Sequence, residues 1–264
     1  MALRLLVTRP QPQADAWVTR LRVHGIDAVA LPLLAIDAVV DLSELHAAWR
    51  DLPRYALVLF VSPNAVSHFF AARPAELAAR GWPAGTRAGA TGPGTVQALQ
   101  LAGVPAALCV APPLHAALFD SAALWAQLRD ETWSGREVLV LRGDGGRDEF
   151  AGYLRGAGAA VHFTQAYRRG PARPSAAEQA LLAASVEQPA THLWWLSSAE
   201  AVGYLPQLAP QADWRDARAL ASHPRIAARA RDVGFGRVFE APPTLDAVKA
   251  ALVRIEACLQ SSPP

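Results

Sequence analysis

Short segments rich in hydroxyl groups, glycine, proline and arginine occur at six places in this 264-residue chain, each directly after a short apolar run. Where such a segment opens a helix, the first backbone N–H groups lack intrahelical acceptors and lie at the positive end of the helix dipole. These features suit a ligand that carries several negative charges. The six segments lie at residues 8–10, 62–64, 91–95, 142–146, 197–199 and 222–225.

Each of these segments also has an ordinary structural explanation. Ser and Thr before a helix are common N-caps, and Pro93 or Pro224 in a first turn presets the backbone angle of the helix. The case for function therefore depends on convergence. In open parallel sheets, ligands bind in the crevice outside the carboxyl ends of the strands, and we expect the six segments to converge on two facing crevices.

The sequence gives little support for a nucleotide-binding loop, a metal site or a catalytic nucleophile. The stretch 143–146 (Gly-Asp-Gly-Gly) matches neither the dinucleotide fingerprint nor the phosphate-binding P-loop. The seven histidines include no pair spaced by three or four residues, so we expect no metal site. No G-x-S-x-G elbow occurs, and neither Cys109 nor Cys258 lies in an activating context. The chain is predicted to bind a polyanion without a cofactor or a covalent nucleophile.

Composition narrows the class of protein further. Charged residues or proline interrupt every apolar run before about 18 residues, so we expect no membrane-spanning segment. No secretory signal is recognised at the N-terminus, and the two distant cysteines are interpreted as reduced thiols, which favours the cytoplasm. The net charge is only +2, with basic residues scattered among acids, and this argues against nucleic-acid binding.

The elements that must position these segments alternate between short apolar strands and amphipathic helices. This alternation predicts βα units and a mostly parallel sheet. In the first helix Ala14, Trp17, Val18 and Leu21 form an apolar stripe that ends before Gly25. Ten strands are predicted, at residues 3–7, 28–31, 56–61, 87–90, 107–110, 138–141, 160–163, 192–196, 217–220 and 237–239.

The chain also resembles itself at an offset of about 133 residues. At this offset Leu6-Val7-x-Arg9 falls on Leu139-Val140-x-Arg142, and Gly25 falls on Gly158. A chance similarity would not keep this order and spacing, so we predict a duplicated five-stranded α/β unit. The segments 29–34 and 163–168 occupy equivalent places, and we expect them to leave their sheets and cross between two domains. Residues 169–174 are interpreted as a loop that leads to a helix from Ser175.

Six motifs occur in order along the chain. They are Leu6-Val7-Thr8-Arg9-Pro10 with Gln13, Ala30-Leu31-Pro32-Leu33, residues 60–66, residues 141–147, residues 161–169 and His223-Pro224-Arg225-Ile226. No single motif would be specific alone, but the six in this order, from residue 3 to about residue 250, resemble the uroporphyrinogen-III synthase family.

The resemblance implies a fold and a reaction. The fold has two similar parallel-sheet, flavodoxin-like α/β domains joined by a two-stranded β ladder, one formed by residues 1–36 and 168–264 and the other by 37–167. The reaction is that of a carbon–oxygen lyase: cyclisation of hydroxymethylbilane to uroporphyrinogen III, with inversion of ring D and loss of water. No cofactor takes part, a monomer is expected, and the preceding bilane synthase is the expected source of the substrate.

The resemblance also suggests roles for individual residues. Tyr167, on the crossing segment, is our choice for the general acid, although a tyrosine there could instead bridge the domains structurally. The remaining candidates would bind the carboxylate arms of the substrate, the hydroxyls directly and the arginines through their charge. They are Thr8, Arg9, Ser62, Thr95, Arg142, Arg147, Ser198 and Arg225.

Two other classes of protein stay open at this stage. A non-catalytic bilobed binding protein or sensor would bind a small polyanionic metabolite without turnover. A flavodoxin-like electron carrier would bind flavin, but the strand ends lack an aromatic-rich flavin loop.

Overall fold

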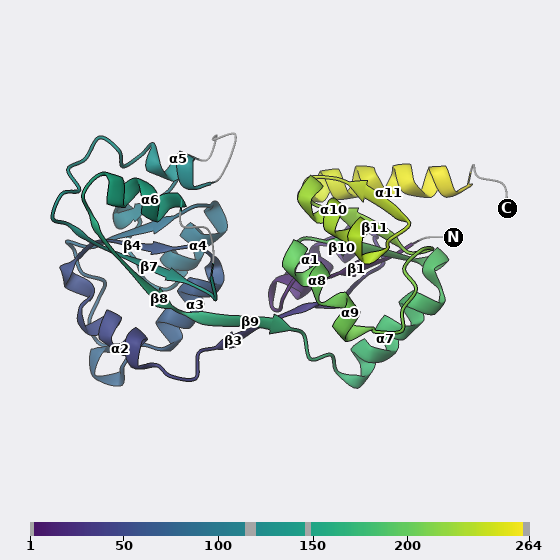
Figure 1. The fold of residues 1–264 in the computed structure, drawn as a ribbon, viewed down its shortest axis with the longest axis horizontal. Helices are drawn as coiled ribbons and strands as arrows, with labels where there is room; N and C mark the ends of the chain where they lie inside the picture. The colour runs from purple at the N-terminus through teal and green to yellow at the C-terminus, as the bar shows by residue number, and fades with distance from the viewer. Residues whose placement is uncertain (1–2, 114–119, 146–148, 261–264) are drawn as a thin grey trace. The chain divides into compact units, whose positions relative to one another are not determined.

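The computed structural model describes residues 3–113, 120–145 and 149–260. The chain divides into two compact units (Figure 1). Unit 1 combines Met1–Ile36 with Gly170–Pro264, and unit 2 is Asp37–Arg169. The sequence interpretation placed the second boundary at residue 168.

Unit 1 is built on a five-stranded parallel sheet in the order β12-β11-β10-β1-β2. Numbered within the unit, this is the order 2-1-3-4-5 of flavodoxin-like folds. The strands are β1 (Arg4–Val7), β2 (Ala28–Ala30), β10 (His192–Leu196), β11 (Arg218–Ala221) and β12 (Arg237–Glu240).

Unit 2 repeats this arrangement in the order β6-β5-β4-β7-β8, again with parallel pairing. β7 takes the place of β1, and β4 takes the place of β10, so the predicted duplication is confirmed. The strands are β4 (Tyr55–Phe60), β5 (Arg87–Ala90), β6 (Cys109–Val110), β7 (Glu137–Arg142) and β8 (Ala160–Gln165).

Two further strands, β3 (Leu34–Ala38) and β9 (Tyr167–Pro171), pair as a separate two-stranded sheet. This confirms the ladder that the family resemblance implied. The predicted crossing segments 29–34 and 163–168 are placed too early, because residues 29–30 still pair within β2 and residues 163–165 within β8. The interpretation of residues 169–171 as loop is wrong, because their backbone pairs with a strand about 130 residues away, and no local pattern signals such a partner. The pairing continues just past the strand, where the Ala172 amide donates to the Leu33 carbonyl at 3.1 Å.

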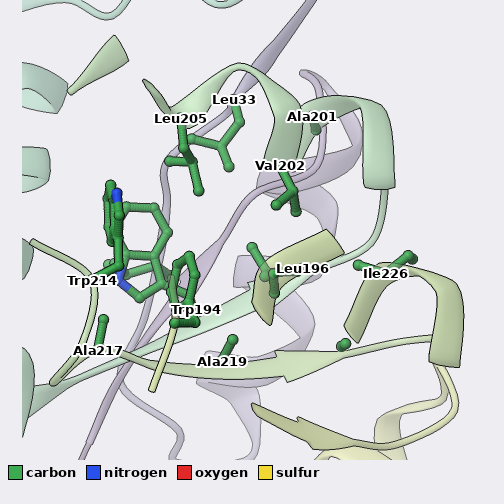
Figure 2. Close-up of a cluster of buried hydrophobic side chains, with 14 of the residues drawn as sticks. Leu33, Trp194, Leu196, Ala201, Val202, Leu205, Trp214, Ala217, Ala219 and Ile226 are labelled. Carbon is green, nitrogen blue, oxygen red and sulfur yellow. The ribbon is translucent and has the colours of Figure 1, made fainter. Parts of the chain in front are cut away.

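Both faces of the unit 1 sheet are covered by helices. On one face Trp194 and Leu196 pack with Val202, Leu205 and Ile226 (Figure 2). On the other face Trp195 packs with α1, where the predicted stripe is confirmed, and Gly25 follows with a φ of +74°. The helices of unit 1 are α1 (Gln13–Val23), α7 (Ala176–Glu187), η4 (Pro189–Thr191), α8 (Ala199–Gly203), α9 (Leu205–Leu208), α10 (Pro224–Val233) and α11 (Leu245–Gln260).

The unit 2 sheet is covered in the same way. Leu57 and Leu59 pack toward α6 on one face, and Phe60 contacts Phe69 of α3 on the other at a ring-centroid distance of 5.6 Å. The predicted strand 107–110 is shorter than expected, because residues 106–108 form a 3-10 turn. The helices of unit 2 are α2 (Ser43–Arg50), η1 (Leu52–Arg54), α3 (Pro63–Ala71), η2 (Ala75–Leu77), α4 (Pro93–Leu101), η3 (Ala106–Leu108), α5 (Ser121–Trp125) and α6 (Glu149–Gly156). Across the described ranges, no helix has the length and apolar character needed to cross a membrane.

Candidate active site

A cavity of about 220 Å³ lies at the carboxyl edge of the unit 2 sheet. Its wall combines apolar side chains with hydroxyls, two arginines and glycine backbone, as expected for a small-molecule site at a strand-end crevice. The cavity is lined by Leu59, Val61, Thr91, Ser121, Val140, Arg142, Gly143, Gly145, Phe150, Ala151, Phe163, Tyr167 and Arg169.

Tyr167 contributes its phenol to this wall. It is the first residue of β9 and is only 5% exposed. Its hydroxyl lies 3.2 Å from Ser62 Oγ, within hydrogen-bond distance. Its ring stacks on the His68 imidazole with centroids 5.8 Å apart, and burial lowers the pKa of His68 below its ordinary value.

Ser62 takes its position from the start of α3. It is the N-cap residue, its Oγ accepts a hydrogen bond from the Ala65 amide at 3.3 Å, and Pro63 occupies the first turn. Ser198 caps α8 in unit 1 in the same manner, with its Oγ accepting from the Ala201 amide at 3.2 Å. Both serines therefore have the ordinary capping role that the sequence allowed, and Ser62 additionally contacts Tyr167.

Arg142 ends β7 and lies over the Phe163 ring, with its guanidinium carbon 4.1 Å from the ring centroid. It also lines a second pocket of about 480 Å³, which adjoins the first because the two share four lining residues. The second pocket adds Arg168, Gln165 and the acidic residues Glu44 and Asp144 to its lining. The space next to Phe163 is thus bordered by two arginines and by two acidic residues.

Thr8 and Arg9 follow β1 in unit 1. Thr8 is 2% exposed, and its hydroxyl donates to the Trp195 carbonyl at 2.7 Å. The Arg9 guanidinium lies 5.6 Å from the ring centroids of both Trp17 and Trp195, and burial lowers the pKa of Arg9. Within the described ranges, Arg9 Nε is buried without a hydrogen-bond partner.

The other three predicted binding residues occupy different settings. Thr95 lies in α4 and is only 4% exposed. Arg225 is exposed in the first turn of α10, where its amide donates to His223 Nδ1 at 3.1 Å. Arg147 lies outside the described residues. Among the residues that the structure covers, no group of three or more His, Cys, Asp or Glu side chains could hold a metal ion.

Comparison with protein families identifies the relatives of this chain. The family described as uroporphyrinogen-III synthase HemD matches residues 15–249. The chain belongs to this family. The resemblance found in the sequence motifs is therefore confirmed.

Individual relatives of the family support the assignment. The uroporphyrinogen-III synthase of Salmonella typhimurium is 31% identical over 179 residues, which cover 68% of this chain and 70% of that protein. The uroporphyrinogen-III synthase of Escherichia coli is 28% identical over 237 residues, covering 88% of this chain and 92% of that protein.

Solved structures of family members share the fold. A mutant uroporphyrinogen III synthase from Thermus thermophilus aligns with a TM-score of 0.56 and 18% identity, covering 99% of this chain and 100% of its own. Uroporphyrinogen-III synthetase from Helicobacter pylori aligns with a TM-score of 0.57 and 14% identity, covering 97% of this chain and 100% of its own.

For this member of the family, the structure groups the predicted residues by unit. In unit 2, Tyr167 and Arg142 line the cavity, Ser62 contacts Tyr167 without lining it, and Thr95 lies outside the lining. Thr8, Arg9, Ser198 and Arg225 follow strands of unit 1. The sequence interpretation did not nominate Thr91, Ser121 or Arg169 as site residues. Thr91 lies in the predicted segment 91–95, from which only Thr95 was nominated, and Arg169 lies in the family motif 161–169. Ser121 carries no such signal.

Proposed function

We propose that this chain cyclises hydroxymethylbilane to uroporphyrinogen III, with inversion of the terminal ring D and loss of water. The observation that carries the proposal is the family match over residues 15–249. The cavity beside Tyr167 and Ser62 supports it, because it offers a proton donor next to an apolar wall that can receive a pyrrole ring.

The substrate's charge defines the first task of the protein. The bilane carries eight carboxylates on its acetate and propionate arms, and these need N–H donors and cations. In unit 2 Arg142 and Arg169 line the cavity and Arg168 lines the adjoining pocket, so they would bind arms by charge-assisted hydrogen bonds. In unit 1 we assign the same task to Arg9 and Arg225 and to the hydroxyl of Ser198, whose oxygen accepts from the Ala201 amide and leaves its O–H able to donate.

Departure of water is the step for which Tyr167 is suited. The leaving hydroxyl is on a carbon attached to a pyrrole, and the nitrogen lone pair can expel it to give an azafulvene. The Tyr167 O–H would donate its proton to that oxygen, so that water leaves. The Ser62 oxygen already accepts from the Ala65 amide, which leaves its own O–H able to donate to the developing phenolate of Tyr167.

Ring inversion is chiefly a matter of positioning. Ring D must attack through its substituted α-carbon to give a spiro intermediate, which then fragments and closes in the inverted orientation. Leu59, Val61 and Phe163 would contact pyrrole rings and keep water from the azafulvene. Holding a flexible chain in the reactive geometry can contribute on the order of 7 to 11 kcal/mol.

Three finer features belong to the same proposal. We expect the enzyme to act as a monomer without a cofactor, to receive its substrate from the preceding bilane synthase, and to work in the cytoplasm. The reduced state that we expect for the two cysteines, Cys109 and Cys258, would fit this compartment.

The decisive experiment supplies hydroxymethylbilane to the purified chain and separates the type I and type III isomers after oxidation to porphyrins. We expect the III isomer to dominate. The control is heat-denatured protein, because the free bilane is expected to close without inversion by itself. Tight binding of the bilane with only the I isomer formed would contradict the proposal and indicate a binding protein.

A further inference from the structure

We propose that Gly143 is a positioning residue for Tyr167. Because residue 143 has no side chain, the phenol ring of Tyr167 can occupy the space beside its backbone. The inference rests on the proposed function in one respect, because it takes Tyr167 as the group that donates the proton. The positional relationship itself depends only on the geometry of unit 2.

The space at Gly143 is already occupied by the tyrosine ring. Gly143 follows β7 directly and is buried. A Cβ atom built on it would lie 2.6 Å from Tyr167 Cε2 and 2.8 Å from Cζ, closer than real Cβ contacts come. Any side chain at this position must therefore displace the ring, and specifically the end of the ring that carries the hydroxyl.

Neither partner has an easy way to move apart. On the tyrosine side, the ring stacks on His68, and the preceding amide, that of Ala166, donates to the Arg142 carbonyl at 2.7 Å. On the glycine side, the loop is held by its next residue: Asp144 accepts hydrogen bonds from Gln165 and from Arg169. The contact is thus fixed from both β8 and β9.

The neighbouring glycines show that this requirement is particular to Gly143. Gly145, two residues on, has a φ of +62°, and a Cβ atom added there would meet nothing within 4 Å, so its need for glycine is conformational. A Cβ atom added to Gly152 in α6 would also meet nothing within 4 Å, and the φ of Gly152 is not positive. A Gly152→Ala variant therefore controls for the loss of glycine flexibility in the same unit.

The first measurement is the steady-state rate of III-isomer formation. Gly143→Ala should lower kcat by about 10²-fold with little change in KM, because it misplaces the acid and leaves the arginines in place. Gly152→Ala should keep the kcat of the parent protein. If Tyr167→Phe is slow while Gly143→Ala keeps the kcat of the parent protein, the inference is overturned.

A double variant separates positioning from a general structural effect. If Gly143 acts through the hydroxyl, Gly143→Ala should change the kcat of a Tyr167→Phe protein by less than about 3-fold. Independent, multiplicative losses in the double variant would show that Gly143 acts by another route. Should Gly143→Ala fail to fold, the added change Tyr167→Leu removes the obstructing ring and must restore folding; continued failure would refute the steric relationship.

A spectroscopic measurement makes failure of this inference distinguishable from failure of the proposed function. The chain has four tyrosines, so protein labelled with ¹³C at tyrosine Cζ gives a simple spectrum in which Tyr167→Phe identifies one signal. Gly143→Ala should shift that signal, and Gly152→Ala should not. An unshifted signal overturns the inference. A shifted signal together with full turnover by Tyr167→Phe supports the ring's positioning by Gly143 and refutes the acid role of Tyr167.

Discussion

The Tyr167 hydroxyl lies 3.2 Å from Ser62 Oγ, and the same serine oxygen accepts the Ala65 amide at 3.3 Å. One side chain therefore connects the start of helix α3 to a phenol 105 residues further along the chain. The capping bond fixes the serine rotamer, so the partner of the phenol is held in place before any substrate binds. This arrangement motivates the first two predictions.

Replacing Tyr167 with Phe removes the proposed acid and keeps the ring that packs against Gly143 and His68. We expect kcat for the III isomer to fall by about 10²-fold, a typical contribution of a general acid. The free energy of unfolding should change by no more than about 1 kcal/mol, because only one hydrogen bond is lost. Circular dichroism and chemical denaturation check the fold. Wild-type turnover by this variant would remove Tyr167 from the mechanism.

Replacing Ser62 with Ala should affect stability and catalysis together. Loss of the cap should lower the free energy of unfolding by about 1 kcal/mol. Loss of the phenol's partner should also lower kcat. The matched control is Ser175→Ala, which removes the N-cap of α7, where Ser175 Oγ accepts from the Glu178 amide at 3.3 Å. The control should lose similar stability and keep its kcat; an equal loss of kcat in both variants would contradict the role of the Ser62–Tyr167 contact.

Gly236 should tolerate no side chain, because of the backbone that faces it. A Cβ atom there would lie 1.8 Å from the Arg215 carbonyl oxygen and 2.8 Å from the carbonyl carbon. Gly236→Ala must shift the backbone, so we expect it to lower the free energy of unfolding by about 3 kcal/mol. Gly81→Ala, with nothing within 4 Å, is the control and should change stability by less than about 0.5 kcal/mol. The measurement is the denaturant midpoint of unfolding for Gly236→Ala and Gly81→Ala. Coinciding midpoints would contradict the prediction.

His68 should make the protein less stable in mild acid. Burial lowers its pKa in the folded state below the ordinary value of 6.5, and the nearby Asp37 charge opposes this only in part. The unfolded chain therefore binds the proton more readily, so stability is complete above pH 6.5 and decreases as the pH falls toward the lowered folded pKa.

His68→Gln should reduce this acid-induced loss of stability, since it removes the titrating group. The measurement is the free energy of unfolding between about pH 7.5 and pH 5 for the parent and the variant. His24→Gln, at an exposed position after α1, controls for the loss of a histidine as such. Identical pH profiles for the His68→Gln protein and the parent would show that His68 does not contribute.

Several parts of the site were predictable because they depend on local sequence. The strand before Ser62 and the helix after it are signalled by an apolar run, a cap residue and Pro63, and all three features appear as expected. For Thr8, local sequence predicts the position but not the hydrogen-bond partner. Its position after β1 was predicted, yet its buried hydroxyl bonds to the Trp195 carbonyl, a partner 187 residues away.

The sequence by itself determined the alternation of strands and helices, the duplication near an offset of 133 residues, and the family, because periodicity and motif order are properties of neighbouring residues. Only the tertiary structure decided which residues of β3 and β9 form the ladder, that the Tyr167 phenol meets Ser62, and that Gly143 leaves room for the ring. These contacts join residues far apart in the chain. Their formation depends on the packing of whole elements against one another, and no local pattern encodes that packing.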